Sequence, residues 1–480
     1  MNFFFIMLSE KMPANSVEKK RPFLLQVLAS FLILLIFNTS YAADQKVITA
    51  SWKAGIARAI ITPEEPIWMA GYGFRDHPSE GTLADLWVKV LVIEDGKGEK
   101  AVLVTADILG FPKKMSDYIR NQIAIKYGLT RAQIILSSSH THSGPVLMDA
   151  LFDVYPLDAK QIEIIRRYSN NLEKKIVALT GEAIHSMVPA HLFSQNGVTR
   201  FQVNRRNNSE STLTSQTELK GPNDYSVPVL KVTDASGNLM AVAFGYSCHA
   251  TVLNIYQFSG DYPGFAQLEL EKMHPDVTAM FFQGAGADQN PLPRRTVPLA
   301  KQYGRELAAA VERVLNEEIE ELEPHLSTAY SEVSLTFSTP PTKEELIKME
   351  KDTIVDQQRW AANQLEILRK TGSLLTSYPY PVQIWKLGAQ SIMIMGGEPV
   401  VQYAIELKKL FGLEIFVMGY ANDEMAYIPS ETVLKEGGYE GESSQMVYGM
   451  PCKWNSDIQV KILEEFKKLA VKAGVKQVSQ

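Results

Sequence analysis

Short apolar runs alternate with amphipathic segments along most of the chain. Runs rich in β-branched residues at Ala101–Ala106 and Ile134–Ser137 are typical of buried strands. Between them, apolar residues recur at helical spacing over Lys113–Tyr127, and Gly128 can end this helix. The same two patterns predict further strands at Val227–Val232, Met240–Tyr246, Val277–Phe282, Val382–Lys386, Ser391–Met395 and Glu414–Met418, and further helices at Lys160–Met187, Pro298–Glu321 and Asp457–Ala473. This alternation predicts an α/β fold, with a mixed β-sheet core flanked by helices in a single large domain.

One helical segment differs from the rest because it is strongly charged. Residues 342–371 follow two consecutive prolines, Pro340 and Pro341, and carry charges on most sides of the expected helix. We therefore predict a solvated helical excursion between two parts of the chain that form sheet.

The N-terminal region has the features of an export signal. The apolar run Phe23–Phe37 follows the basic cluster Lys19–Arg21 and is shorter than the roughly 18–20 residues that cross a bilayer as a helix. Small residues follow the run, as signal peptidase requires, and Ala42 is the best cleavage position. We expect residues 1–42 to be a cleaved signal peptide and the mature protein to be periplasmic or secreted; an uncleaved anchor is the alternative.

Composition excludes several classes of protein. The chain has 48 Lys and Arg against 54 Asp and Glu, a formal net charge of −6, and no long basic block, so nucleic acid is not expected as a partner. Cys248 and Cys452 are the two cysteines, which are too few for a disulfide framework or a cysteine-rich zinc module. The sequence leaves open whether they pair, and it does not define an oligomeric state.

Two of the eight histidines lie together directly after a predicted strand. His140 and His142 are two residues apart, so on an extended chain both imidazoles point to the same side. Such a pair can present two nitrogen ligands to one cation, or one to a cation and one to a substrate, and imidazole suits zinc. The alternative is a polar loop whose histidines only form hydrogen bonds.

Two further candidates also lie at the ends of predicted strands. His249 follows Met240–Tyr246, and Glu398 lies on a turn between a strand and a helix. Each has a purely structural alternative, because a lone histidine is often a satisfied core residue and an acidic residue in a first helical turn is favoured by the helix dipole. The glycine-rich loop Phe282–Pro291 has neither the Lys-Ser/Thr of a P-loop nor G-x-G-x-x-G spacing, which argues against a nucleotide site.

Taken together and in this order, these segments resemble the neutral/alkaline non-lysosomal ceramidase family, specifically its N-terminal zinc amidase domain. The most specific piece is His140-Thr141-His142-Ser143-Gly144-Pro145, and the similarity extends from Ala54–Arg58 to about the last helix. The resemblance implies one large neutral-ceramidase-like catalytic domain over residues 43–480.

The resemblance also implies roles for individual residues. It assigns one Zn²⁺ per chain to four ligands, His140, His249, Glu398 and Tyr427. It assigns the substrate side of the site to His142, Tyr439, which follows Tyr427 by twelve residues, and Arg205, with Arg206 as the alternative arginine. Such a mixed nitrogen and oxygen set leaves a position for a water, which zinc activates for attack on a carbonyl. The family tolerates additional Ca²⁺ or Mg²⁺, but no loop in this sequence locates such an ion.

Two departures from the family concern the substrate. Asn290 occupies the position of the family's active-site serine, and an amide has no hydroxyl to orient at a carbonyl. We also expect a shorter homologue, without the C-terminal immunoglobulin-like domain of ceramidases. We therefore expect a secreted or periplasmic zinc-dependent amidohydrolase that acts on N-acylsphingosine or another small-molecule or lipid N-acyl substrate, with peripheral membrane contact as a possibility. The alternatives are a non-catalytic lipid- or glycan-binding protein on the same fold and a metal-dependent ester or phosphoester hydrolase.

Overall fold

The larger of two sheets contains most of the strands predicted for the first half of the chain. The structure, a computed structural model, describes residues 51–216, 218–352 and 354–478, so the predicted signal peptide lies outside the described residues. The strand order is β11-β9-β8-β6-β1-β3-β4-β5. The bounds are β1 Trp52–Ile60, β3 Trp87–Glu94, β4 Lys100–Ala106, β5 Ile134–Ser138, β6 Val188–Val198, β8 Ser226–Asp234, β9 Leu239–Tyr246 and β11 Thr278–Gln283. The pairs β4–β5 and β9–β11 are parallel and the others antiparallel, so the sheet is mixed.

A second sheet packs face to face on the first. It has the order β13-β14-β15-β17, with β13 Leu326–Thr336, β14 Ser377–Leu387, β15 Gln390–Met395 and β17 Phe416–Met418. Leu103 and Phe282 of the first sheet share one buried cluster with Trp385 and Phe416 of the second. Side chains alternate between the two faces of each strand, so that Val104 faces the opposite way from Leu103 and packs on helices instead.

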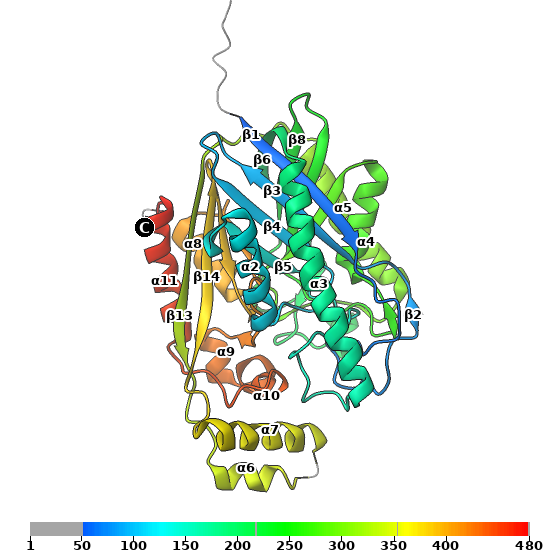
Figure 1. The fold of residues 1–480 in the computed structure, drawn as a ribbon, viewed down its shortest axis with the longest axis vertical. Helices are drawn as coiled ribbons and strands as arrows, with labels where there is room; N and C mark the ends of the chain where they lie inside the picture. Colours follow the sequence, from blue (N-terminus) through cyan, green and yellow to red (C-terminus); the bar gives the residue numbers. More distant parts are fainter. Residues whose placement is uncertain (1–50, 217, 353, 479–480) are drawn as a thin grey trace, which may run out of the picture. The chain divides into compact units, whose positions relative to one another are not determined.

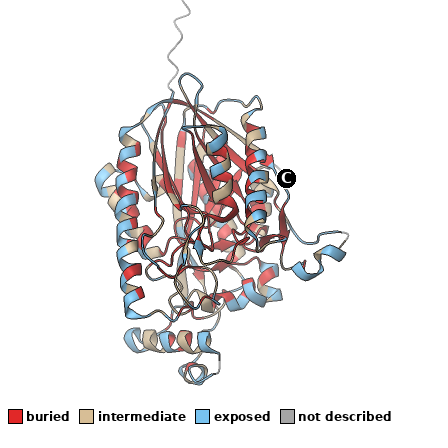
Figure 2. Ribbon diagram, turned by 90° about the vertical axis from the view of Figure 1, so that its right-hand side faces the viewer, coloured by how far each residue is buried: buried red, intermediate tan, exposed pale blue. Residues whose placement is uncertain are grey.

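Helices cover both outer faces, which gives four layers (Figure 1). The helices α2 Lys113–Tyr127, α3 Ala159–His185, α4 Asp261–Met273 and α5 Val297–Leu315 pack on the larger sheet, and α8 Gln402–Phe411 and α11 Ile458–Ala473 pack on the smaller one. Figure 2 shows the strands buried and the helices exposed on their outer sides. The predicted mixed sheet core flanked by helices is confirmed, although the strands divide into two packed sheets.

Helix α2 shows how local sequence sets these boundaries. It runs over the predicted residues and ends where Gly128 takes a left-handed conformation with φ 71°, which costs glycine little. The apolar positions on one face, Met115, Ile119 and Ile123, are buried against the sheet, whereas Ile125 on the opposite face is exposed. Burial of each such side chain contributes roughly 1.5–3 kcal/mol, which anchors the helix on one face.

Short elements connect the layers. The two-stranded pairs are β2 Gly81–Thr82 with β10 Gln257–Phe258, β7 Gln202–Asn204 with β12 Gln289–Pro291, and β16 Glu398–Pro399 with β18 Tyr427–Ile428. The remaining helices and single turns are α6 Lys343–Met349, α7 Val355–Thr371, α9 Glu431–Glu436, α10 Ser444–Val447, η1 Arg131–Gln133, η2 Glu210–Ser215 and η3 Tyr439–Ser443.

The segment predicted as a helical excursion forms α6 and α7, drawn at the lower end of Figure 1. One side of α7 packs on the main body, since Trp360 is only 4% exposed and its indole Nε1 donates to the carbonyl of Met450 at 2.9 Å. Gln364 donates to the carbonyl of Gly449 in the same way.

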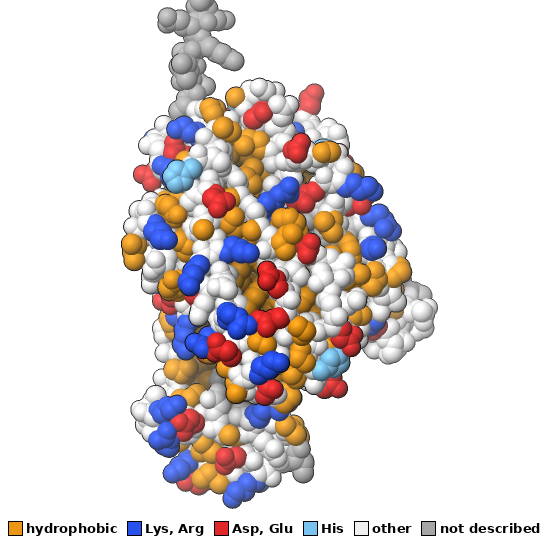
Figure 3. Space-filling model, turned by 45° about the vertical axis from the view of Figure 1, so that its right-hand side comes forward, with side chains coloured by type: hydrophobic (Ala, Val, Ile, Leu, Met, Phe, Trp, Pro, Cys, Tyr) orange, Lys and Arg blue, Asp and Glu red, His pale blue; other side chains and the backbone are white. Residues whose placement is uncertain are grey.

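The surface shows no separation of charge on the face in view. Figure 3 shows Lys and Arg side chains interspersed with Asp and Glu over that face. None of the helices among the described residues is both long enough and apolar enough to span a membrane.

Candidate metal centre

Two histidine-bearing loops of the larger sheet lie side by side. His140 and His142 follow β5, and His249 follows β9. The sheet twists so far that its edge strands β5 and β11 contact each other, which brings these strand ends together. A parallel bridge pairs Thr141 with Ala250, and the amide of His142 donates to the carbonyl of Ala250 at 3.3 Å.

The two-stranded pair of β16 and β18 supplies a carboxylate and a phenol to the same place. Glu398 lies in β16 after the end of β15, and parallel pairing of β16 with β18 sets it directly opposite Tyr427. The loop after β17 is joined to β5 through Asn422, whose amide donates to the carbonyl of Leu136 and whose side chain accepts from the amide of Leu136. Both sheets therefore fix the relative positions of the four predicted ligands.

The four side chains and His142 converge on a small volume. Glu398 Oε2 lies 3.1 Å from His249 Nε2 and 3.3 Å from His140 Nε2. The hydroxyl of Tyr427 lies 3.3 Å from His249 Nε2, and the Nε2 atoms of His140 and His142 are also 3.3 Å apart. All five side chains are buried, and His249 has no exposed surface.

The hydrogen bonds of the histidines determine which ring nitrogen faces this volume as an acceptor. His140 Nδ1 lies 2.8 Å from the carbonyl of Leu109, and His249 Nδ1 lies 3.0 Å from the carbonyl of Gly286. A carbonyl only accepts, so both Nδ1 atoms carry the proton, and in the neutral rings both Nε2 atoms present a lone pair. These lone pairs face Glu398 Oε2, which accepts no hydrogen bond from the described residues although it is buried.

That arrangement fits a cation. Lone pairs on two imidazoles and one carboxylate oxygen repel one another at 3.1–3.3 Å unless a positive ion lies between them. The donor set of two imidazoles, a carboxylate and a phenol is one that zinc accepts, and the two Nδ1 bonds to carbonyls are the outer contacts that orient histidine ligands.

Burial keeps the ring nitrogens available. Burial, followed by the charge of Arg205, lowers the pKa of His249 to about 4. Burial and the neighbouring His140 lower the pKa of His142 well below its ordinary value. Burial raises the pKa of Glu398, but His140 and His249 outweigh it, and the net pKa lies well below the ordinary value. At neutral pH these two imidazoles are therefore neutral and the carboxylate is ionised, as metal ligands require.

Arg205 and Asn290 reach the same centre through the pairing of β7 with β12. The amide of Arg205 donates to the carbonyl of Asp288 at 2.8 Å, which holds its side chain across the site. Its guanidinium donates to the Tyr427 hydroxyl at 3.2 Å, to Glu440 Oε1 at 2.7 Å and to Asn290 Oδ1 at 3.4 Å. The structure thus brings these residues together as the resemblance implied.

The alternative arginine, Arg206, binds glutamates outside the proposed ligand set. Arg206 donates to Glu440 Oε2 at 2.7 Å and to Glu436 Oε2 at 2.9 Å, and the structure gives it no hydrogen bond to Tyr427. Tyr439 begins η3 with its ring centroid 5.2 Å from that of Tyr427, and it is 45% exposed. Tyr439 therefore lies at the solvent side of the centre.

A glycine makes room for the second histidine. Gly71 has φ 99°, and a Cβ at this position would lie 2.5 Å from the His142 ring. The ring of Tyr72 contacts the same imidazole with centroids 4.8 Å apart, and Arg75 donates to the His142 carbonyl at 2.9 Å. Gly71, Tyr72 and Arg75 therefore fix the position of His142. None of these contacts involves its Nδ1, which has no hydrogen-bond partner among the described residues.

Three functional neighbours were missed by the sequence analysis. The hydroxyl of Tyr448 donates to Glu398 Oε1 and lies 3.5 Å from Glu424 Oε1, while Glu440 binds Arg205. Glu424 could have been found, since it follows the end of a predicted strand as His140 does. Glu440 directly follows Tyr439, which the resemblance assigns to the site. No pattern in the sequence indicates Tyr448.

The comparisons with known proteins identify the class of protein. The family model for neutral/alkaline non-lysosomal ceramidase, N-terminal, matches residues 52–291, half of the chain. The chain therefore belongs to the neutral/alkaline non-lysosomal ceramidase family.

Individual relatives agree with this membership. The chain is 26% identical over 238 residues to the neutral ceramidase of Drosophila melanogaster, which covers 47% of this chain and 33% of that protein. It is 28% identical over 198 residues to neutral ceramidase B of Dictyostelium discoideum, which covers 38% of this chain and 26% of that protein. The matched region thus spans a third or less of these relatives.

A solved structure shows the same fold. The crystal structure of neutral ceramidase from Pseudomonas aeruginosa superposes with a TM-score of 0.68 at 19% identity, covering 90% of this chain and 76% of that chain. At this identity the likeness supports the fold and not the substrate.

Proposed function

We propose that the chain is a zinc-dependent hydrolase of an amide bond in a lipid or other N-acyl substrate, and that it resembles ceramidases in this activity. The observation that carries the proposal is the convergence of two Nε2 lone pairs on Glu398 Oε2, because only a cation reconciles these atoms. His140, His249, Glu398 and Tyr427 are the proposed ligands. The family membership supports a hydrolase that cleaves amide bonds.

Zinc held by these residues would activate a water molecule and polarise the scissile carbonyl. His142 is the proposed acceptor for the proton of that water, because both oxygens of Glu398 are already engaged, Oε1 with Tyr448 and Oε2 at the proposed ion. The unpartnered Nδ1 of His142 leaves the imidazole free to pass a proton on to the leaving amine.

Three groups are placed to stabilise negative charge on the carbonyl oxygen. Arg205 is fixed by Glu440 and the Tyr427 hydroxyl, and Tyr439 stands beside it at the solvent side. Asn290 Oδ1 accepts from Arg205 and lies 3.5 Å from the Thr251 hydroxyl, which leaves the Asn290 amide group as a donor to substrate. Hydrogen-bond donors that are already oriented before the reaction contribute most of the stabilisation of such a transition state. Asn290 thereby replaces the family's serine as a hydrogen-bond donor.

The relatives named above are neutral ceramidases, so an N-acylsphingosine is the first substrate to test and sphingolipid metabolism the first setting. We further propose that residues 1–42 direct the chain to the periplasm or outside the cell. A processed N-terminus at residue 43, read by mass spectrometry of protein recovered from that compartment, is the result expected; an intact N-terminus would contradict it.

Metal content and turnover test the function together. We expect about one zinc per chain by elemental analysis, release of amine from an N-acyl panel, and loss of both in Glu398→Ala. Metal-free wild type purified without chelators, or turnover that survives in Glu398→Ala, would overturn the proposal. Zinc without turnover of any amide would favour a binding protein on the same fold, and preferential cleavage of esters or phosphoesters would change the reaction class.

A further inference from the structure

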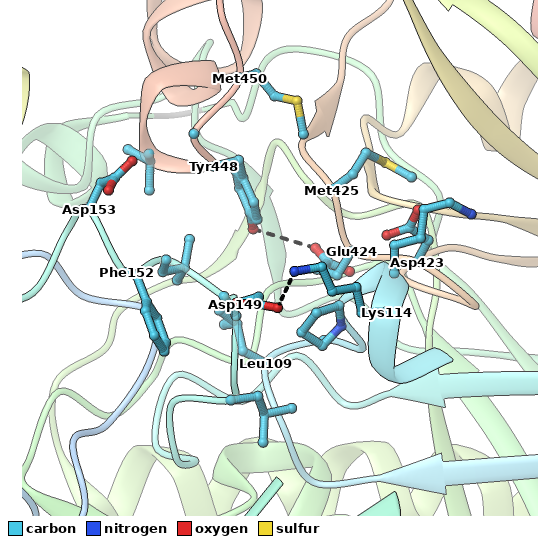
Figure 4. A pocket seen from close by; sticks show the side chains of 18 of the residues that line it. Leu109, Lys114, Asp149, Phe152, Asp153, Asp423, Glu424, Met425, Tyr448 and Met450 are labelled. Carbon is cyan, nitrogen blue, oxygen red and sulfur yellow. Dashed lines mark hydrogen bonds and ion pairs between the residues drawn. The ribbon is translucent and has the colours of Figure 1, made fainter. Parts of the chain in front are cut away.

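A cavity of about 660 Å³ is lined in part by Tyr448 (Figure 4), whose hydroxyl donates to Glu398 of the metal centre. We name it the side cavity. Its walls come from the loop after His142, from α7, and from the segments around Met425 and Met450. A volume of this size is in the range of small-molecule sites.

Most of the wall is apolar. The side chains that give it this character are Leu147, Phe152, Ile367, Leu375, Met425 and Met450. Leu375 is half exposed, so the apolar surface continues to the mouth. Exposed apolar side chains that continue into a cavity favour a ligand with a hydrocarbon part.

The wall that α7 provides is fixed by specific contacts. Arg359 donates to the carbonyls of Asp153 and Val154, both at 2.6 Å, and Asn363 donates to Asp153 Oδ2 at 2.9 Å. Together with the bond from Trp360 to the Met450 carbonyl, these contacts tie α7 to two other walls. The side cavity is thus a built feature and not a gap beside a loosely attached helix.

The inner end of the side cavity carries two carboxyl groups without a lysine or arginine partner; the nearest basic group is the His140 imidazole, whose Nδ1 lies 3.8 Å from Glu424 Oε1 and donates to the carbonyl of Leu109. The side chain of Glu424 and the residue Asp423 are each only 4% exposed, and both line the cavity. Glu424 Oε2 and Asp423 Oδ1 have no hydrogen-bond partner, and neither carboxyl forms an ion pair with a lysine or arginine among the described residues. By contrast, Asp149 nearer the mouth is paired with Lys114 at 2.7 Å.

Local geometry fixes these carboxyl groups. Glu424 lies across Gly110, where an added Cβ would come within 2.2 Å of the Glu424 side chain. Tyr378 donates to Asp423 Oδ2 at 2.7 Å, which holds the carboxyl group in place. Burial raises the pKa of Asp423 to about 7, although the hydrogen bond from Tyr378 and the charge of Lys113 lower it.

We propose that the side cavity binds an amphipathic cation, with a protonated amine at Glu424 and Asp423 and a hydrocarbon part along the apolar wall. A buried carboxylate is stabilised by a partner of opposite charge that also donates hydrogen bonds, and an ammonium does both. The apolar wall excludes a bare ion as the best-fitting occupant. This inference is independent of the proposed function, since it requires neither zinc nor turnover.

The test is calorimetric titration of the zinc-loaded full chain with octylamine and with octanol, which share the tail and differ in the charged head. We expect octylamine to bind at least about tenfold more tightly, the contribution of a charge-assisted hydrogen bond. The Asp423→Asn, Glu424→Gln double variant should lose this preference. The matched control Asp149→Asn, which alters a carboxylate of the same cavity that already has a partner, should retain it.

A second variant keeps the inference testable if the double variant fails to fold. Ile367→Trp fills the cavity from the outer part of α7 and should weaken the binding of both probes by about tenfold or more. Equal affinities for the two probes in the wild type, octylamine binding that is unchanged in Ile367→Trp, or a preference that persists in the double variant would each overturn the proposal. Competition by micromolar Ca²⁺ or Mg²⁺ would also overturn it, in favour of a metal-ion site.

Discussion

Two buried glutamates stand on either side of Tyr448, and their surroundings give them opposite properties. Glu398 faces two imidazole nitrogens, and these outweigh burial and hold its pKa well below the ordinary value. Glu424 has only His140 Nδ1, 3.8 Å away and already bonded to the carbonyl of Leu109, and burial, followed by the charges of Glu398 and Asp423, raises its pKa well above the ordinary value. The metal centre and the side cavity thus use one residue type for two kinds of site.

The difference teaches that burial of a carboxyl group does not by itself indicate function. The two sites differ in the atoms around the carboxyl group. Nitrogen lone pairs beside Glu398 favour a metal ion, whereas the apolar wall beside Glu424 favours an organic cation. The predictions below test each side of this contrast.

The largest effect is expected at the metal centre. His249→Ala removes a fully buried ligand, and we expect zinc content to fall well below one per chain and kcat/KM to fall by about 10³-fold or more, since metal catalysis supplies several kcal/mol. Elemental analysis and amide hydrolysis measure both. His274→Ala is the matched control, because that histidine pairs with Glu312 on the surface; similar losses in both variants would contradict the assignment.

Arg205 should matter almost as much. Arg205→Met removes the donor that contacts Tyr427 and Asn290, and we expect kcat to fall by about 10²–10³-fold, as for loss of an oxyanion donor. Arg206→Met, which loses the contacts to Glu436, Glu440 and the carbonyl of Gly437, should change kcat by less than about tenfold. Steady-state kinetics of both variants check this, and an equal loss in the two would place the wrong arginine in the site.

Tyr448 separates the two sites, so its hydroxyl tests their independence. Tyr448→Phe removes the proton donor to Glu398 Oε1, and zinc affinity should weaken about 10–100-fold, as for other outer contacts of metal ligands. Competition with a chelator measures the affinity. Tyr378→Phe is the control, because its hydroxyl binds Asp423 in the side cavity, and it should leave zinc affinity unchanged.

The smallest effect concerns pH and the side cavity. The folded-state pKa of Asp423, about 7, lies above its unfolded value, so the folded chain holds this proton where the unfolded chain has released it. This stabilisation is complete below about pH 4 and is lost as pH rises to about 7. Between pH 5 and pH 6 the free energy of unfolding should fall about 1 kcal/mol more in the wild type than in Asp423→Asn. Urea titrations at both values measure this; a variant that follows the wild type would show that Asp423 titrates normally.

Much of the fold follows from local patterns in the sequence. Helix α2 and strands β5 and β9 run within a residue or two of their predicted bounds, because their apolar periodicity and end signals are local. Helix α5 ends at Leu315, earlier than the predicted end at Glu321. The charged residues after Leu315 extend the helical pattern in the sequence, but they do not pack against the core. Strands β1, β3, β6 and β13 were not predicted individually, and β6 in particular shows mostly half-buried positions.

The residues of the candidate site were also predictable only in part. Residue types and order along the chain indicated His140, His142, His249 and Glu398, since each follows a strand, and the resemblance added Tyr427, Tyr439 and Arg205. The sequence determined the α/β class, the bounds of the strongly periodic elements and this set of side chains. Only the tertiary structure decided that β16 pairs Glu398 with Tyr427, that Tyr448 and Glu424 join them, and that α7 closes a second cavity. Those contacts join segments far apart in sequence, and they depend on sheet twist and packing, which no local pattern specifies.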